Sequence, residues 1–308
     1  MNIDFPHALR RHLGPLKPLA GGLLAAALVA GCGGGGSSAS SESSSASTVT
    51  SSPAVVSTLT CEATASVSTA QGRLDNNAWN RAAVGSQTWQ QCLRQSVKDG
   101  VTDIGWQWDW PTTSSVVLSY PRLMIGANPW EDGARRSDSR FPVSLQSTSS
   151  LRLQYTLDIT PSGTDSRFNL ATSMWLINTP TVATPFDVNA ITTEVMVWTR
   201  ADGTDWATNQ TPVATVTIDG RTWNVYRNPA QRDASGGSSH TWQLLVFAIS
   251  GAATTTLDVD LKKLLQYTID QGWVDGSHYI ANVELGNEIV GGKGETWVRK
   301  FALDLTTR

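Results

Sequence analysis

The sequence has few charged side chains, few histidines and few cysteines. Charged residues make up 16% of the 308 residues, below the roughly 25% that is usual for soluble domains. The formal net charge of −3 argues against a protein that binds nucleic acid by neutralising phosphates. Four His and three Cys are too few and too scattered for a zinc or iron–sulfur centre.

Sequence signatures of cofactor sites are also missing. No glycine-rich phosphate loop opens a helix, and no Ser/His/Asp arrangement stands in a recognisable context. We therefore expect neither a metal ion nor an organic cofactor.

Tryptophan is the residue in excess, because 13 Trp outnumber six Phe and five Tyr. Surplus Trp indicates either surfaces on which flat apolar faces such as sugar rings stack, or a Trp-rich β core. Composition alone does not decide between the two.

Residues 1–31 are predicted to be an export signal. Arg10, Arg11 and Lys17 precede an apolar run, residues 19–30, that is too short to span a membrane comfortably. The run ends in Leu-Val-Ala-Gly before Cys32, which resembles the bacterial lipobox, whose Cys is lipidated and becomes the mature N-terminus. Cleavage as an ordinary signal peptide is the alternative. The lipobox predicts a lipoprotein whose only link to a membrane is this anchor, at the outer membrane or cell surface.

Residues 32–58 are predicted to be a flexible tether, because residues 33–58 contain 11 Ser and open with four consecutive Gly. The catalytic or binding domain would then be residues 59–308, a length that suits a single all-β domain. Cys61 and Cys92 are its only cysteines. In an exported protein such a pair favours a disulfide worth about 3 kcal/mol, although two free buried thiols are the alternative.

The domain is predicted to consist mainly of strands. Apolar and polar residues alternate over 151–159, and short runs with the same pattern recur between Gly, Asp-Gly and Pro turn signals. The recurring runs are 115–120, 168–177, 194–199, 214–218, 222–226, 241–249, 279–289 and 296–305. Only residues 257–271 have helical spacing. The pattern predicts a β-jelly-roll sandwich of two antiparallel sheets with one helix and a concave substrate cleft.

Two strands place glutamates on a face that is expected to be polar. Glu194, Met196 and Trp198 share one face of their strand, and Glu284 and Glu288 share a face of another. A carboxylate cannot lie unpaired in a dry core, so these faces are expected to line a cleft, although solvent-facing strand residues would read the same way. Two carboxylates beside a Trp-lined face are typical of glycoside hydrolysis.

Several short motifs, in this order along the chain, resemble those of glycoside hydrolase family 12. Residues 194–198 resemble the family's nucleophile motif, and residues 286–292 resemble its acid/base motif. Similar matches to family motifs are Asn76-Asn77-Ala78-Trp79, Trp106-Gln107-Trp108, Ser119-Tyr120-Pro121 and residues 126–130. Cys61 and Cys92 stand where many members have a disulfide. The resemblance covers essentially all of residues 60–308.

The resemblance implies a retaining endo-β-1,4-glucanase acting on cellulose-type, mixed-linkage or xyloglucan chains. Glu194 would be the nucleophile and Glu288 the acid/base. Glu284 would raise the pKa of Glu288 or bind a sugar hydroxyl. The expected sugar contacts are Asn77, Trp79, Trp130, Met196 and Trp198, with Trp108 and Trp110 undecided between the cleft and the core. The remaining Trp outside these motifs are expected in the core or at the rim.

One position departs from the family pattern. Members usually carry an Asp that hydrogen-bonds the nucleophile, and Ser173 stands in its place. A hydroxyl can donate to Glu194 but cannot share a proton with it, so we expect a shifted pH optimum. The alternatives to a monomeric glucanase are a non-catalytic glucan-binding surface lipoprotein on the same fold and a structural envelope lipoprotein.

Overall fold

The computed structural model describes residues 53–204 and 209–308. The predicted signal peptide, the lipidation residue Cys32 and most of the predicted tether lie outside the described residues. The first strand, β1, begins at Val55, before the predicted domain start at residue 59. Its backbone pairs with β4 from Val55 onward, and for this reason residues that read as tether are part of the sheet.

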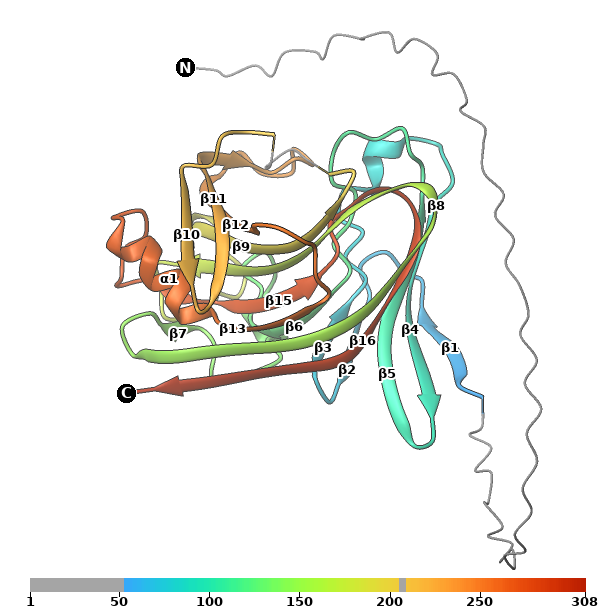
Figure 1. Cartoon of the computed structure of the whole chain (residues 1–308), viewed down its shortest axis with the longest axis horizontal. Coiled ribbons are helices and arrows are strands. Elements are labelled where there is room, and N and C mark those ends of the chain that lie inside the picture. The colour runs from blue at the N-terminus through green and yellow to red at the C-terminus, as the bar shows by residue number, and fades with distance from the viewer. Residues whose placement is uncertain (1–52, 205–208) are drawn as a thin grey trace, which may run out of the picture. The chain divides into compact units, whose positions relative to one another are not determined.

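Strands dominate the described residues (Figure 1). They are β1 (Val55–Thr60), β2 (Ser66–Thr69), β3 (Gly72–Asp75), β4 (Gln90–Lys98), β5 (Val101–Trp110), β6 (Arg122–Gly126), β7 (Val143–Ser144), β8 (Thr148–Ile177), β9 (Ile191–Asp202), β10 (Ala214–Ile218), β11 (Arg221–Arg232), β12 (Thr241–Ile249), β13 (Thr256–Asp260), β14 (Tyr279–Ile280), β15 (Asn282–Gly286) and β16 (Ile289–Thr307). The helix α1 spans Leu261–Asp270, and short 3₁₀ turns span Arg81–Val84, Gly133–Arg135 and Val188–Ala190.

The strands form two layers that share the long, bent strand β8 (Figure 1). In the outer layer the order is β1, β4, β5, β16, the first half of β8, and β13. In the inner layer the second half of β8 lies between β9 and β15, followed by β12, β11 and β10 on one side and by β6, β3 and β2 on the other. This is the predicted jelly roll.

Two details of the sheet differ from the prediction of two antiparallel sheets. The hydrogen-bonded ladder is continuous, because β8 passes from one layer into the other. The pairing of β9 with β12 is parallel, with Glu194 opposite Leu244.

The core lies between the layers and follows the strand period of two. In the second half of β8 the even-numbered residues, among them Leu170 and Met174, are buried in it, and so are Val195 and Val197 of β9. Val283 and Leu285 of β15 and Leu245 and Phe247 of β12 add to it. The intervening residues of all four strands therefore face away from the core, on the other side of the inner layer.

Two sequence-based element predictions were wrong, one in where the element begins and one in its type. The predicted helix at 257–271 begins only at Leu261, because Leu257 and Val259 are buried strand residues of β13 and the Asp260 side chain caps the helix by accepting from the backbone N–H of Lys262. The predicted strand at 115–120 is a loop that makes a single bridge, between Ser119 and Ile289.

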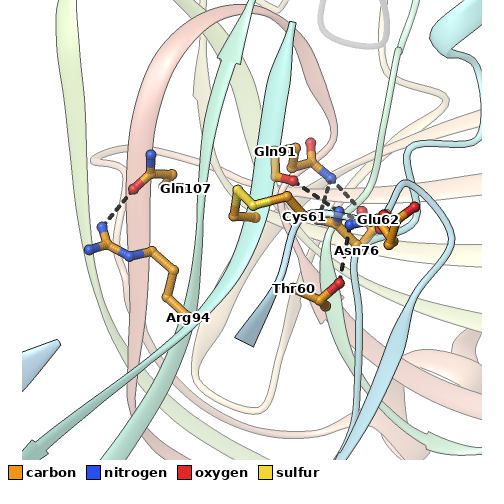
Figure 2. Close-up of a disulfide and its surroundings, with 8 residues drawn as sticks. Thr60, Cys61, Glu62, Asn76, Gln91, Arg94 and Gln107 are labelled. Atoms are coloured by element: carbon orange, nitrogen blue, oxygen red, sulfur yellow. Dashed lines mark hydrogen bonds between the residues drawn. A yellow bond between two sulfur atoms is a disulfide. The ribbon is translucent and has the colours of Figure 1, made fainter. Parts of the chain in front are cut away.

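The predicted disulfide between Cys61 and Cys92 is present (Figure 2). It links the end of β1 to β4. Beside it, the buried amide of Asn76 donates to the backbone oxygens of Glu62 and Gln91. Disulfide and amide together tie the N-terminal edge of the sheet to the loop that follows β3.

Candidate active site

Three neighbouring strands bring the predicted glutamates onto one face of the inner layer. The odd-numbered residues Asn169, Ala171, Ser173 and Trp175 of β8 share this face with Glu194, Met196 and Trp198 of β9, and with Asn282, Glu284 and Gly286 of β15. We call it the carboxylate face. The prediction that Glu194, Met196 and Trp198 share a face is confirmed.

Glu194 is half-buried and receives two hydrogen bonds. The Ser173 hydroxyl donates to its Oε1 at 2.9 Å, and the indole N–H of Trp242 donates to its Oε2 at 3.3 Å. Burial and the negative charge of Glu288 raise the pKa of Glu194 to about 8, and the two hydrogen bonds oppose this rise.

Glu288 lies between β15 and β16 and is held by Asn169 of β8. The Asn169 amide donates to the Glu288 carboxylate, and its oxygen accepts from the Glu288 backbone N–H at 3.1 Å. The neighbouring Asn287 is buried and accepts from the indole of Trp106 and the hydroxyl of Thr296. The hydrogen bonds of Asn169 and Asn287 therefore fix the backbone around Glu288. Burial raises the pKa of Glu288 to about 7, against the effect of the Asn169 hydrogen bond.

The two carboxylates together retain a proton near neutral pH, because burial penalises both charges and the charge of Glu288 further disfavours ionisation of Glu194. Two donors stabilise the ionised form of Glu194, whereas one side-chain donor reaches the Glu288 carboxylate. The hydrogen bonds on their own favour an ionised Glu194 and a protonated Glu288, whereas burial and the charge of Glu288 leave Glu194 with the higher pKa, about 8 against about 7. Such a pair offers one nucleophilic carboxylate and one acid.

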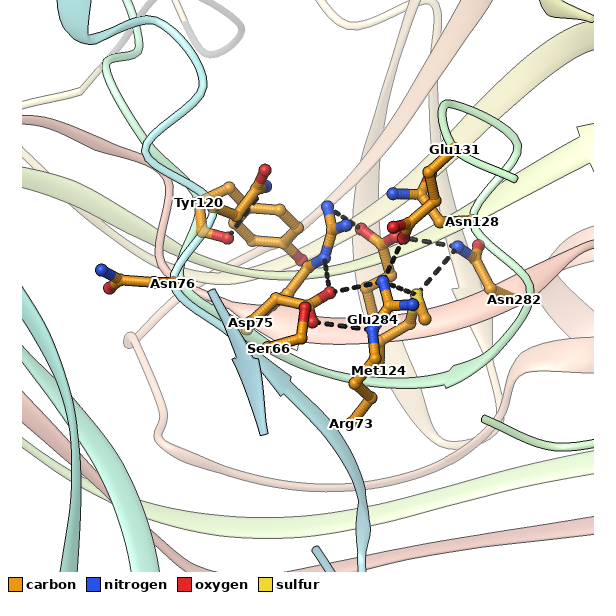
Figure 3. A network of polar contacts seen from close by, with 12 residues as sticks. Ser66, Arg73, Asp75, Asn76, Tyr120, Met124, Asn128, Glu131, Asn282 and Glu284 are labelled. Atoms are coloured by element: carbon orange, nitrogen blue, oxygen red, sulfur yellow. Dashed lines mark hydrogen bonds and ion pairs between the residues drawn. The ribbon is translucent and has the colours of Figure 1, made fainter. Parts of the chain in front are cut away.

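Glu284 belongs to a buried charge network, which was not predicted (Figure 3). Only 1% of its surface is exposed. Its Oε2 pairs with Arg122 at 3.2 Å, and its Oε1 accepts from the Asn282 amide at 2.8 Å. Arg122 also pairs with Asp75 at 3.4 Å. Because both oxygens are engaged and buried, the prediction that Glu284 binds a sugar hydroxyl has no support in the structure.

The electrostatic prediction for Glu284 was wrong in its target. Burial alone accounts for the raised pKa of Glu288, whereas the charge of Glu284 contributes to the raised pKa of Glu194. Glu284 stands opposite Ser173 in the sheet, which is the residue that hydrogen-bonds Glu194. Burial also raises the pKa of Glu284 itself to about 7, although Arg122 opposes this.

The network continues to the loop that carries Trp130. Arg73 pairs with Asp75 at 2.7 Å and also with Glu131, which in turn pairs with Arg135 at 2.6 Å. Figure 3 shows Arg73, Asp75 and Glu284 converging between β3, β6 and β15. These ion pairs hold the loop after β6 against the carboxylate face.

Three tryptophans pack edge to face beside Glu194. The ring centroids of Trp130, Trp175 and Trp242 lie 5.2 to 5.5 Å apart, with interplanar angles of 63° to 75°. Trp175 and Trp242 are each 7% exposed, whereas Trp130 is half-buried. The structure thus places the predicted stacking residue Trp130 next to the carboxylates, with part of its ring surface free.

Met196 and Trp198 do not form an exposed floor, contrary to the prediction. They are 2% and 1% exposed, because Tyr120, Tyr226 and Val246 pack over them in a cluster on the carboxylate face. The correct face was predicted, but these two side chains have no free surface on which a sugar ring could stack.

Asn77 and Trp79 lie in the loop after β3. The Asn77 amide donates to the backbone oxygen of Tyr120 at 3.2 Å, and its φ of 42° places it in the left-handed region that Asn tolerates. Trp79 is half-buried. Tyr120 connects this loop to the carboxylate face, because its hydroxyl donates to the backbone oxygen of Ala171.

The remaining tryptophans are mostly structural. Trp108 and Trp110 are each 2% exposed, and Trp110 stacks on Trp89 and donates to Gln91. Both are therefore core residues, and Trp223 is fully buried. Trp242 is the exception, since it was expected in the core or at the rim and instead contacts Glu194.

Four residues of the site were missed in the sequence. Asn169, Trp175, Trp242 and Arg122 contact a glutamate or a tryptophan of the site. Asn169 and Trp175 lie on the same face of their strand as Ser173, so the alternation of residues in the sequence could have placed them at the site. Trp242 and Arg122 reach the site only through pairing between strands distant in sequence.

An open hollow of about 730 Å³ lies where β8 enters the inner layer. Its lining includes Asp165, Ser166, Arg167 and Asp202, next to the strand residue that holds Glu288. Within residues 53–204 and 209–308, no three His, Cys, Asp or Glu side chains are grouped as a metal site requires. In the same part of the chain, no helix has the length and apolarity needed to cross a membrane.

Comparison with known proteins gives a family match and several named relatives. The family model for glycosyl hydrolase family 12 matches residues 71–306. Endoglucanase S of Pectobacterium parmentieri is 26% identical over 236 residues, covering 75% of this chain and 81% of that protein. The xyloglucan-specific endo-beta-1,4-glucanase A of Aspergillus niger is 26% identical over 239 residues, covering 75% and 84%.

Solved structures agree on the fold. The native family 12 xyloglucanase from Bacillus licheniformis superposes with a TM-score of 0.66 at 24% identity, covering 82% of this chain and 100% of that one. Since the family model matches residues 71–306, most of the described domain, the chain belongs to glycosyl hydrolase family 12 and is a glycoside hydrolase.

Proposed function

We propose that the chain is a retaining endo-β-1,4-glucanase that uses Glu194 as nucleophile and Glu288 as acid and base. The observation that carries this proposal is that side chains of a single strand, β8, hydrogen-bond both carboxylates. Ser173 and Asn169 share one face of this strand and hold Glu194 and Glu288 respectively. Four residues along a strand span roughly 13 Å between Cα atoms, and the two carboxylates are near enough that the charge of Glu288 raises the pKa of Glu194.

The first chemical step forms a bond between the Glu194 carboxylate and the anomeric carbon. The glycosidic C–O bond breaks, and the proton of Glu288 passes to the departing oxygen. In the second step Glu288 takes a proton from water, the resulting hydroxide attacks the anomeric carbon, and the Glu194 carboxylate leaves. The raised pKa of Glu288 supports its role as acid near neutral pH.

The substrates proposed are cellulose-type, mixed-linkage and xyloglucan chains. The names of the relatives support this range, since they include an endoglucanase and a xyloglucan-specific endo-glucanase. Trp130 and Trp79 supply half-buried rings for stacking on glucose units. Reducing-sugar release compared across carboxymethylcellulose, barley mixed-linkage glucan, xyloglucan and xylan defines the preference.

The catalytic assignment is tested with Glu194→Ala and Glu288→Ala. Both variants should lose hydrolysis of soluble β-glucan and keep binding in affinity electrophoresis. Glu295→Ala is the matched control, because Glu295 lies on the outer layer, where it pairs with Arg94. Full activity in either active-site variant refutes the assignment. A parent protein that binds glucan without cleaving it would make the chain a binding protein on the same fold.

Retention is tested separately by proton NMR of the first product formed. A β-configured new reducing end supports the double displacement, and an α-configured one refutes it. Azide should also rescue Glu194→Ala by forming an α-glycosyl azide, because a small anion can replace a missing nucleophile on that face of the sugar.

We also propose that Cys32 carries lipid and anchors a monomeric enzyme at the outer membrane or cell surface. The lipobox-like run before Cys32 supports this. Labelling with a radioactive fatty acid should mark the parent but not Cys32→Ser, and the variant should appear in the soluble fraction. Equal labelling of both proteins would contradict it.

A further inference from the structure

Trp242 lies on β12, which pairs with one edge of β9, the strand that carries Glu194. Ser173 lies on β8, which pairs with the other edge of β9. β9 lies between β8 and β12, and Glu194 stands opposite Trp175 of β8 and opposite Leu244 of β12. Trp242 precedes Leu244 by two residues on β12, so both side chains point to the carboxylate face. Only 7% of the Trp242 surface is exposed.

The two donors reach different oxygens of the same carboxylate. Ser173 donates to Oε1 at 2.9 Å and Trp242 donates to Oε2 at 3.3 Å. A carboxylate held at one oxygen can still rotate about its Cγ–Cδ bond, whereas one held from both flanking strands has a defined plane. Attack on a sugar carbon requires such alignment.

The Trp242 ring is itself held in place. Its edge-to-face neighbours are Trp130 at 5.2 Å and Trp175 at 5.5 Å, and His240 stacks on it at 6.5 Å. His240 is fixed in turn by a contact of 2.8 Å between its Nε2 and the backbone oxygen of Ile191. The indole N–H therefore points at Glu194 with little freedom to move.

We propose that Trp242 is a positioning residue for Glu194, and that its indole N–H supplies the second hydrogen bond where Ser173, a neutral donor, provides the first. The proposal deepens the assignment of Glu194 as nucleophile and rests on it. A neutral pair of donors stabilises the ionised carboxylate without adding a titrating group beside it.

The charges of Glu288 and Glu284 act on Glu194 and must stay constant in a test. The other titratable side chains packed near the site are Arg122, which pairs with Glu284, His240, which stacks on Trp242, and His278, which contacts Thr192 two residues before Glu194. Replacing Trp242 by another aromatic residue leaves all of these charges in place.

The test compares Trp242→Phe with Trp175→Phe on soluble β-glucan. Both changes shrink one ring of the same tryptophan cluster, but of these two indoles the one that donates to Glu194 is that of Trp242. Losing a hydrogen bond to a charged group should lower kcat about tenfold or more, with KM changed less than about twofold. The acid limb of the pH profile should move up by about one unit, because the ionised form of Glu194 is less stable.

Trp175→Phe should leave the acid limb in place, even where its packing defect changes activity. If Trp242→Phe does not fold, the isosteric analogue β-(3-benzothienyl)alanine at position 242 keeps the ring shape and removes the N–H. The same shift in the analogue supports the proposal. An acid limb in either 242 variant that coincides with that of Trp175→Phe overturns it. Full activity of Glu194→Ala would instead overturn the proposed function.

Discussion

Replacing Ser173 by Asp should move the pH optimum of hydrolysis toward acid. Ser173 is fully buried and its Oγ lies 2.9 Å from Glu194 Oε1, so an Asp there would share one proton with Glu194. Two carboxylates about 4 Å apart repel by about 4 kcal/mol at an effective dielectric constant of about 20, which separates their two dissociations by about 3 pKa units. The first dissociation, which leaves Glu194 ionised beside a protonated Asp, is the one that generates the active form.

The sign follows from the state that hydrolysis needs. In the parent, burial and the charge of Glu288 raise the pKa of Glu194 to about 8, so its ionisation sets a high acid limb. In Ser173→Asp the singly ionised pair is stabilised by the shared proton, and the acid limb of kcat/KM should fall by about one unit. Activity at the new optimum should stay within about tenfold of the parent, since a donor to Oε1 is preserved.

The assay is a pH–rate profile on barley mixed-linkage glucan at constant ionic strength. Ser173→Asn is the matched control, because Asn has nearly the shape of Asp and does not titrate. Its acid limb should stay with the parent's. An Asp profile that overlays the parent's, or that moves toward alkaline pH, refutes the reasoning about the shared proton.

Three further changes test the charge network, the carboxylate pair and the disulfide. Glu284→Gln should move the acid limb down, because the charge of Glu284 raises the pKa of Glu194; an unchanged limb would show that Arg122 already cancels this charge. Glu288→Gln should have a free energy of unfolding, measured in urea, about 1–2 kcal/mol higher than that of the parent at pH 8, but not at pH 4. The reason is that the stability linked to a carboxyl with a raised folded-state pKa is present below about 4.5 and lost as pH rises through about 7; a gain that is equal at both pH values would contradict it. Replacing Cys61 and Cys92 together by Ser should lower the unfolding free energy by about 3 kcal/mol, with the reduced parent as control; a loss below about 1 kcal/mol would count against the disulfide's contribution.

Local periodicity was enough to predict which residues share a face. The alternation along β9 placed Glu194, Met196 and Trp198 together, and the structure agrees. Burial of Met196 and Trp198 was not predictable, because it depends on Tyr120 and Tyr226, which reach them from a loop and from β11. The alternation within a strand predicts to which face of the sheet a side chain points, but not which side chains from other elements cover it.

Contacts across strands explain the other differences. Trp242 touches Glu194 because β12 pairs in parallel with β9, and nothing local in 241–249 specifies that partner. The start of α1 was misplaced because Leu257 and Val259 fit a helical spacing as well as a strand, and only the pairing of β13 with β8 resolves the ambiguity. Both cases concern long-range register rather than local propensity.

The two long strands have a consequence for the timing of folding. β16, the last strand, has 19 residues and pairs along its length with β8 and also with β5. Its final residue, Thr307, lies opposite Thr148. Pairings so distant along the chain close slowly. The outer layer lacks its central strand until β16 has been synthesised, so β5 and the first half of β8 cannot be joined into one layer before then. The domain therefore stays an open chain until nearly all of its own residues are available.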